Sequence, residues 1–229
     1  MPEPDHPIRL ACLDMAGTTV ADDGTVVAAF THAMAAQGVE PGTDPFEQAL
    51  DYVRATMGES KIRVFRSLFD DDEAVAQAAN TAFEDAYGAI VADGGMVAIP
   101  GAPEAIATLR SNGVKVCLTT GFAAPTRDAI LEALGWLDLV DLALAPADAG
   151  RGRPFPDMVL TALLRLEVDD VAQVAVVGDT ANDVLSGVRA GASIVAGVRT
   201  GAHTDAQLRA AGATHVLDSV ADLPQLLLA

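Results

Sequence analysis

The segment IRLACLDMAGTT, residues 8–19, decides how this chain folds. It starts as a short apolar run rich in branched residues, reaches Asp14 and continues into a Gly-Thr-Thr turn. This is the pattern of a buried β-strand that presents a carboxylate at its end, where the side chain is suited to act as a nucleophile. Two residues later stands Ala16, at a position where a second acid is expected beside such a nucleophile. The segment therefore raises the question of which reaction uses the carboxylate without the acid.

Hydrophobic periodicity divides the rest of the chain into two parts. Residues 26 to about 94 show the period of helices in four successive segments and contain no convincing strand. The predicted strands of the second part are 114–120, 139–145, 172–179 and 193–198. Each is followed by a helical segment, and one more strand–helix pair comes after them. Strand–helix alternation with right-handed crossovers builds a parallel sheet with helices on both faces. We predict a doubly wound α/β core, residues 1–22 and 97–229, with a helical cap, residues 23–96, inserted after the first strand.

The composition limits the partners and the location that we expect. The chain has 229 residues, of which 51% are hydrophobic, and a formal net charge of -18, which argues against nucleic acid or an anionic membrane as a partner. No run of 18 apolar residues occurs, and the N-terminus lacks the pattern of a secretory signal, so we expect a cytoplasmic protein. Cys12 and Cys117 lie inside apolar runs and are predicted to be buried thiols without a chemical role.

Polar residues stand where the predicted strands end, which is the edge at which sheets of this kind bind ligands. The first strand ends at Asp14, and the strand 114–120 leads into Thr120 and Gly121, a hydroxyl and amides suited to phosphate oxygens. The strand 172–179 ends at Asp179, and Asp183 follows one helical turn later. These side chains are therefore expected to meet in one crevice.

A cation is expected in that crevice. Three carboxylates held close together repel one another unless a positive charge lies among them, and oxygen ligands with a phosphoryl substrate suit Mg2+. Arg153, just ahead of a helix that is predicted to begin near Pro156, supplies a further positive charge. The residues together predict a nucleophile, a metal ion and a phosphate clamp.

Four motifs in this order resemble those of the haloacid dehalogenase superfamily: DMAGTT (14–19), TTG (119–121), GRPFPDM (152–158) and GDTANDVLSGVRAGA (178–192). Within that superfamily, Ala16 in the first motif and Arg153 in place of the usual lysine of the third resemble phosphonatase, or phosphonoacetaldehyde hydrolase, and the phosphonatase-like hydrolases. In the predicted cap, MGESK (57–61) is similar to the phosphonatase stretch in which Met-Gly is followed by the lysine that forms a Schiff base.

The resemblance implies a function and a set of site residues. It implies a Mg2+-dependent hydrolase that cleaves the carbon–phosphorus bond of phosphonoacetaldehyde or a related 2-oxoalkylphosphonate, with Asp14 as nucleophile and Lys61 as imine-forming amine. The implied metal ligands are Asp14, the backbone carbonyl of Ala16, Asp179 and Asp183. The implied substrate and phosphate contacts are Ala16, Gly17, Thr18, Thr120, Gly121, Arg153, Met57 and Gly58. The resemblance also implies a homodimer that pairs through the cap.

Ala16 and Lys61 together suit a change of mechanism. A phosphate ester expels an alkoxide, and protonation of this leaving group by a nearby acid accelerates hydrolysis by roughly 100- to 10,000-fold. Ala16 provides no such acid. Cleavage of a carbon–phosphorus bond beside a carbonyl instead needs a sink for electrons on carbon, and a protonated imine with a lysine is such a sink.

Lys61 is also unusual in its setting. At 100 degrees per residue it falls within an apolar stripe on its predicted helix, where partial loss of water favours the neutral amine. The stripe consists of Ile62, Val64, Phe65, Leu68 and Phe69. The chain has twelve arginines and two lysines, and the other lysine, Lys115, is expected to be solvated at the start of a strand.

Two departures from the phosphonatase pattern leave alternatives open. Phosphonatases carry a proton-shuttling histidine at the position of Val64 and a tyrosine at the position of Phe122. The four histidines of this chain, His6, His32, His203 and His215, lie outside the motifs and are expected to be surface or core residues. The alternatives are a phosphatase of the same fold that acts on a small phosphate monoester and a non-catalytic sensor of a phosphate ligand.

Overall fold

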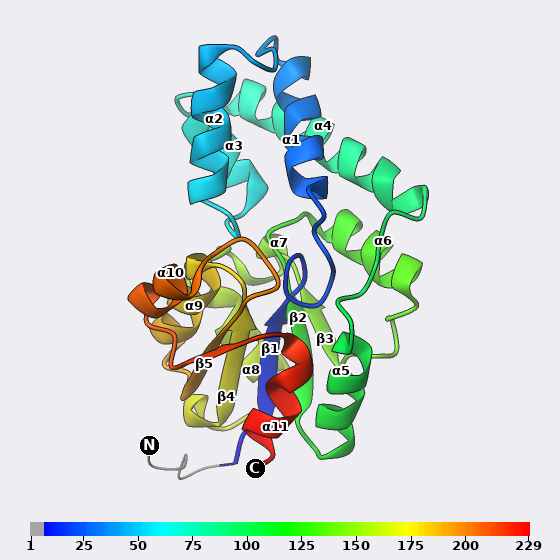
Figure 1. The fold of residues 1–229 in the computed structure, drawn as a ribbon, viewed down its shortest axis with the longest axis vertical. Helices are drawn as coiled ribbons and strands as arrows, with labels where there is room; N and C mark the ends of the chain where they lie inside the picture. Colours follow the sequence, from blue (N-terminus) through cyan, green and yellow to red (C-terminus); the bar gives the residue numbers. More distant parts are fainter. Residues whose placement is uncertain (1–6) are drawn as a thin grey trace.

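The computed structural model describes residues 7–229, so the first six residues of the predicted core, His6 included, lie outside the described residues. The six strands of the described residues form one parallel sheet in the order β3-β2-β1-β4-β5-β6 (Figure 1). The strands are β1 (Leu10–Asp14), β2 (Lys115–Thr119), β3 (Leu142–Leu144), β4 (Val174–Gly178), β5 (Ile194–Val198) and β6 (His215–Leu217). The predicted doubly wound α/β fold is confirmed.

The strand β1 lies in the middle of the sheet and is buried along its whole length. Its side chains alternate between the faces, so Ala11 and Leu13 join one apolar cluster while Leu10 and Cys12 join another. The helices α5 (Ala102–Ser111), α6 (Ala124–Leu134) and α11 (Leu223–Leu227) contribute to the first cluster, and α8 (Asp157–Arg165) contributes to the second. Cys12 pairs in register with Cys117, and both are buried free thiols, as predicted.

The remaining elements of the core connect the strands. They are α7 (Pro146–Ala149), α9 (Ala181–Ala190), α10 (Asp205–Ala211) and two 3-10 turns, η1 (Val171–Gln173) and η2 (Val220–Asp222). The helix α9 begins directly after β4 because Thr180 caps it: its hydroxyl accepts from the Asp183 amide while the Asp183 carboxylate accepts from the Thr180 amide. This reciprocal cap orients Asp183 toward the end of β4.

Of the five helices between β1 and β2, the first four stand beyond the carboxyl ends of the strands (Figure 1). They are α1 (Thr25–Ala36), α2 (Asp44–Ala55), α3 (Lys61–Leu68) and α4 (Glu73–Ala92), and they occur in the block predicted to be helical. Their shared interior is aromatic, and the buried rings are Phe30, Phe46, Phe65, Phe83 and Tyr87. This group of helices is called the cap below.

The two chain segments that join the cap to the core lie side by side. Val20 forms an antiparallel bridge with Ala98, and the Ala21 amide donates to the Val97 carbonyl oxygen over 2.8 Å. The chain therefore enters and leaves the cap at the same place, beside the end of β1. Within residues 7–229, no helix is both long enough and apolar enough to cross a membrane.

Candidate active site

The turn after β1 holds Asp14 in place. The hydroxyl of Thr19 donates to the Asp14 carbonyl oxygen over 2.8 Å, and the amides of residues 17–20 donate to carbonyl oxygens within the turn. Gly17 has a φ of 85 degrees, and a Cβ atom there would lie 2.6 Å from an Asp179 carboxylate oxygen, so glycine is needed for both backbone and space. Because the amides of Gly17 and Thr18 have partners inside the turn, their contact with a phosphate stays a prediction.

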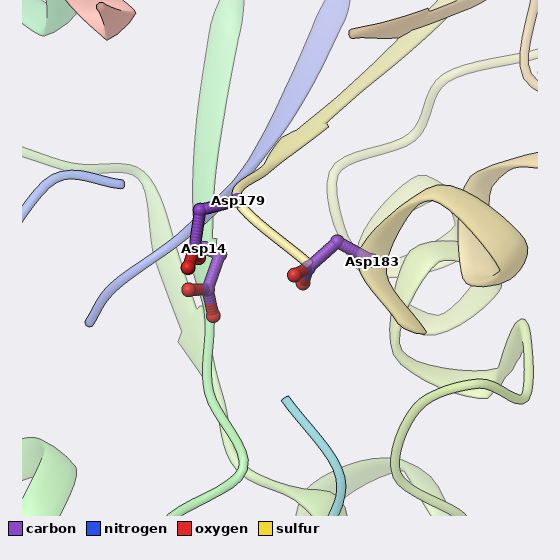
Figure 2. Close-up of side chains that lie close together, drawn as sticks. All are labelled: Asp14, Asp179 and Asp183. Carbon is purple, nitrogen blue, oxygen red and sulfur yellow. The ribbon is translucent and has the colours of Figure 1, made fainter. Parts of the chain in front are cut away.

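Three buried carboxylates meet beyond the ends of β1 and β4. Asp14, Asp179 and Asp183 each have an oxygen within 4.8 Å of the others, and Figure 2 shows the three side chains converging from β1, the end of β4 and α9. Burial, followed by the charge of Asp14, raises the pKa of Asp179 to about 7. Buried carboxylate oxygens this close together fit a hard divalent cation, so this carboxylate cluster is a candidate Mg2+ site.

Each carboxylate of the cluster also has a partner in the protein. Asp179 accepts from the Thr18 hydroxyl over 3.2 Å and from the Ala202 amide over 2.8 Å. Thr18 thus contacts the cluster through its side chain.

Arg153 is the cation nearest to the cluster. It is only 3% exposed, its Nη1 lies 2.5 Å from an Asp14 carboxylate oxygen, and it forms a second ion pair with Asp183. Its buried Nε has no hydrogen-bond partner among the described residues. A buried donor without a partner costs free energy, and an anionic ligand could supply the oxygen acceptor that this Nε lacks.

The end of β2 meets the cap segment 57–61. The Lys61 amide donates to the Gly121 carbonyl oxygen over 3.2 Å, and the Asn182 side-chain amide donates to the Met57 carbonyl oxygen over 2.8 Å. A Cβ atom on Gly121 would lie 2.5 Å from the Glu59 carbonyl oxygen, so glycine permits this close approach. Hydrogen bonds from two core elements therefore hold the Met-Gly segment over the strand ends.

Lys61 begins helix α3 beside two aromatic rings. Its Nζ lies 5.6 Å from the centre of the Phe122 ring and 5.7 Å from that of Phe83. Burial, and then the charge of Arg153, lower the pKa of the Lys61 ammonium from its usual value. Of the residues in the predicted apolar stripe, Val64 and Phe65 are buried in the cap.

One cavity of about 270 Å3 brings these groups together. Among the predicted site residues, Thr18 and Asp183 do not line it, although both contact residues that do. The predicted residues that line it are Asp14, Ala16, Gly17, Met57, Gly58, Lys61, Thr120, Gly121, Arg153 and Asp179. Asp14, the predicted nucleophile, and Lys61, 47 positions later in the chain, therefore line the same cavity.

Sequence reasoning missed several residues that line the cavity. The loop after β5 contributes Thr200, Gly201 and Ala202, and the rule that ligands bind at strand ends would have found them. Asp22, on the connection from β1 to the cap, was also missed as a site residue because no periodic pattern marks that segment. His203, expected to be a surface or core residue, accepts a hydrogen bond from the Ala181 amide at the start of α9.

Known proteins match this chain in sequence. A family model described as haloacid dehalogenase-like hydrolase matches residues 8–191. A phosphonoacetaldehyde hydrolase of Syntrophobacter fumaroxidans is 33% identical over 204 residues, covering 81% of this chain and 70% of that protein. A probable phosphatase of Dickeya dadantii, IndB, is 30% identical over 217 residues, covering 93% of this chain and 91% of that protein.

Solved structures match it in fold. The crystal structure of a phosphonoacetaldehyde hydrolase-like protein from Oleispira antarctica has a TM-score of 0.82 and 26% identity, covering 97% of this chain and 92% of that chain. A hydrolase from Pseudomonas syringae has the same TM-score at 24% identity and shares the fold. With a family model that spans most of the chain, and carboxylates meeting at the strand ends, this chain belongs to the haloacid dehalogenase-like hydrolase family.

Proposed function

We propose that this hydrolase cleaves the carbon–phosphorus bond of phosphonoacetaldehyde or a related 2-oxoalkylphosphonate through a lysine imine and an aspartyl-phosphate. The observation that carries the proposal is the single cavity lined by both Asp14 and Lys61. The similarity to the Syntrophobacter fumaroxidans phosphonoacetaldehyde hydrolase supports the same substrate class. Ala16, which also lines the cavity, supports a reaction that needs no acid at that position.

Lys61 performs the first half of the proposed reaction. Its lowered pKa favours the neutral amine, which adds to the carbonyl carbon of the substrate and forms an imine with loss of water. The protonated imine accepts the electron pair of the carbon–phosphorus bond when that bond breaks. The carbon fragment then leaves as a neutral enamine, and no alkoxide has to be protonated.

Asp14 performs the second half. One of its carboxylate oxygens attacks phosphorus as the carbon–phosphorus bond breaks, which gives an aspartyl-phosphate. A proton from water adds to the enamine carbon and gives back the imine. Water then hydrolyses the imine to the aldehyde and free lysine, and the aspartyl-phosphate to free phosphate. Arg153 and Thr120 line the cavity and would bind the phosphoryl oxygens during this transfer.

The carboxylate cluster supports a role for Mg2+. When bound, the ion would neutralise charge on the phosphoryl group and polarise its oxygens. The residues that would hold it are Asp14, Asp179, the Ala16 carbonyl and Asp183.

A phosphate-ester phosphatase is the second candidate. The similarity to the probable phosphatase of Dickeya dadantii, which extends over 91% of that protein, favours it. In that case Lys61 would be dispensable for turnover, and a group other than Ala16 would protonate the leaving group. The non-catalytic alternative does not fit a chain that belongs to a hydrolase family.

The proposal is tested by turnover of phosphonoacetaldehyde with Mg2+, with phosphate and acetaldehyde measured in parallel. Wild type should release the two products in equal amounts. Lys61→Arg should lower the rate to that of the reaction without enzyme, because a guanidinium keeps the charge but forms no imine. Lys115→Arg is the matched control, since Lys115 is the other lysine of the chain, and it should retain the wild-type rate.

Equal rates for wild type and Lys61→Arg would contradict the proposal. Efficient hydrolysis of a panel of phosphate monoesters, without release of acetaldehyde from phosphonoacetaldehyde, would support the phosphatase.

A further inference from the structure

Asp22 is a carboxylate of the cavity that the proposed reaction leaves without a role. In the described part of the chain, the acidic residues that line the cavity are Asp14, Asp22 and Asp179. Asp14 and Asp179 belong to the carboxylate cluster, whereas Asp22 does not. It therefore lines the chamber that also holds Lys61 without being part of the candidate metal site.

The carboxylate of Asp22 is held by the cap. Its Oδ1 accepts from the Val26 amide over 3.0 Å, in the first turn of α1. No described residue donates a hydrogen bond to its Oδ2. Asp22 is half-buried, so one oxygen is fixed by the helix start and the other remains for a ligand or a proton.

Other acidic groups around Lys61 have partners that occupy them. Glu84, on α4, accepts from the Ala123 amide over 3.1 Å and from the Thr126 hydroxyl. Tyr87, on the same helix, is fully buried with its hydroxyl against the Met96 sulfur, and burial raises the pKa of this phenol.

Asp14 is paired with Arg153 and is the proposed nucleophile, so it has its own task.

Charge supports a link between Asp22 and Lys61. Burial and Arg153 lower the pKa of Lys61, while the carboxylates of Asp22, Asp14 and Glu84 oppose this shift, Asp22 most strongly. No described carboxylate lies within 4.0 Å of Nζ in an ion pair, which leaves room between the two groups for reacting atoms.

We propose that Asp22 is the acid–base residue of imine formation at Lys61, an inference that rests on the proposed function. Its carboxylate lines the same cavity as the amine, is oriented by the start of α1 and has a free oxygen. Val64, at the position where phosphonatases carry a proton-shuttling histidine, is buried in the cap and has no group that exchanges protons. Asp22 thus supplies proton transfer from another element, the β1–α1 connection.

The proton transfers balance over the sequence of steps. The Lys61 ammonium gives one proton to the Asp22 carboxylate, and the neutral amine forms a nitrogen–carbon bond with the carbonyl carbon. The carbonyl electron pair moves to oxygen, which takes one proton from nitrogen. Asp22 then gives its proton to this hydroxyl, the carbon–oxygen bond breaks, water leaves and the nitrogen lone pair forms the protonated imine. Asp22 is a carboxylate again at the end.

The test compares Asp22→Asn with Asp23→Asn in the full-length protein. Asn keeps an acceptor for the Val26 amide and removes the proton-exchanging group, so the melting temperature should stay at the wild-type value. Asp23 is exposed and does not line the cavity, so its variant controls for the change in net charge. Asp22→Glu restores a carboxylate and should recover part of the rate.

The measured quantity is the rate at which borohydride, added at set times after phosphonoacetaldehyde or 2-oxopropylphosphonate, traps an adduct on Lys61. Asp22→Asn should slow trapping by about 100-fold or more, the usual contribution of a general acid–base group. Asp23→Asn should trap at the wild-type rate. A residue with only a structural role would change the melting temperature and leave the trapping rate unaffected in the Asn variant.

Two results would overturn the inference, and they differ. If wild type forms the adduct and Asp22→Asn forms it equally fast, Asp22 has no part in proton transfer while the proposed function stands. If wild type forms no adduct with either phosphonate, imine formation itself is absent, and the proposed function fails together with the role of Asp22.

Discussion

At the scale of single residues, Ala16 separates the two candidate reactions. It lines the cavity close to the Asp14 turn, yet it has no proton to give to a leaving group. Lys61, at the start of the cap helix α3, lines the same cavity. If the two residues belong to one mechanism, then adding an acid at position 16 should favour ester hydrolysis over carbon–phosphorus cleavage.

Ala16→Asp tests this directly. We expect the ratio of ester hydrolysis to phosphonoacetaldehyde cleavage to rise by roughly 100-fold, the lower part of the range for general acid catalysis. The change should be in kcat, because an acid at this position acts on the leaving group in the transition state. The measurement is kcat and KM on a small phosphate monoester and on phosphonoacetaldehyde. An unchanged ratio of kcat values would mean that position 16 does not face the leaving group.

The raised pKa of Asp179 predicts how Mg2+ binding depends on pH. Burial and Asp14 raise its pKa to about 7, above the value of about 3.9 for an aspartate in an unfolded chain. The folded protein without metal therefore binds more protons than the unfolded chain between these values, and this contribution to stability is lost as the pH rises through about 7. Mg2+ must displace that proton, so its affinity should fall by up to about tenfold per pH unit below pH 7.

Thermal melting with and without Mg2+ checks this prediction. We expect the increase in melting temperature caused by a fixed Mg2+ concentration to be larger at about pH 8 than at about pH 5.5. Asp179→Asn should remove most of the increase at both pH values. An increase that is equal at the two pH values would show that no carboxylate with a raised pKa binds the ion.

At the scale of elements, the site depends on contact between the cap segment 57–61 and both the end of β2 and the start of α9. Lys61 contacts Gly121 through its backbone, and Met57 contacts Asn182, a residue 125 positions away in the chain. Gly121 has no space for a Cβ atom, which would lie 2.5 Å from the Glu59 carbonyl oxygen. A larger residue at this position should therefore displace the cap segment.

Gly121→Ala should lower kcat/KM for phosphonoacetaldehyde by at least about tenfold, because a displacement of about 1 Å can reduce turnover by about 100-fold. Gly88→Ala is the matched control: Gly88 lies within α4, and nothing is within 4 Å of its added Cβ atom. The control should retain activity and melt at the wild-type temperature or above. Equal kcat/KM values for the two variants would show that the contact at Gly121 does not position Lys61.

Elements also show how far the sequence predicts the fold. Strands β1, β2, β4 and β5 occur where short apolar runs predict them, because both faces of a doubly wound sheet are buried. The strand predicted over 139–145 is shorter, and only Leu142–Leu144 pairs with β2.

The way in which the cap rests on the core was beyond sequence reasoning. It depends on hydrogen bonds between residues far apart in the chain, such as Asn182 and Met57, and no local pattern encodes these. The same limit explains the site. Asp14 and Asp179 could be predicted because strand ends are predictable, and Arg153 because it stands just ahead of a predicted helix. Asp22 instead lies on an irregular connection whose position relative to Lys61 depends on the cap.

At the scale of the whole molecule, a strongly acidic chain places two basic residues in its candidate site beside three aspartates. The net charge is -18, yet the cavity is lined by Arg153 and Lys61. Arg153 forms ion pairs with the carboxylate cluster. Lys61 lies beside aromatic rings and forms no ion pair with any described residue. We therefore propose that Arg153 binds the anionic group of the substrate and that Lys61 forms an imine with its carbonyl carbon.

The most direct test of that claim is the mass of the intact protein after borohydride reduction in the presence of phosphonoacetaldehyde, followed by peptide mapping. Wild type should gain one adduct on the peptide that contains Lys61. Asp14→Asn should gain it too, without releasing phosphate, because it lacks the nucleophile but keeps the amine. Lys61→Arg should gain none. Turnover of phosphonoacetaldehyde by wild type with no adduct on Lys61, and with full activity in Lys61→Arg, would contradict the account.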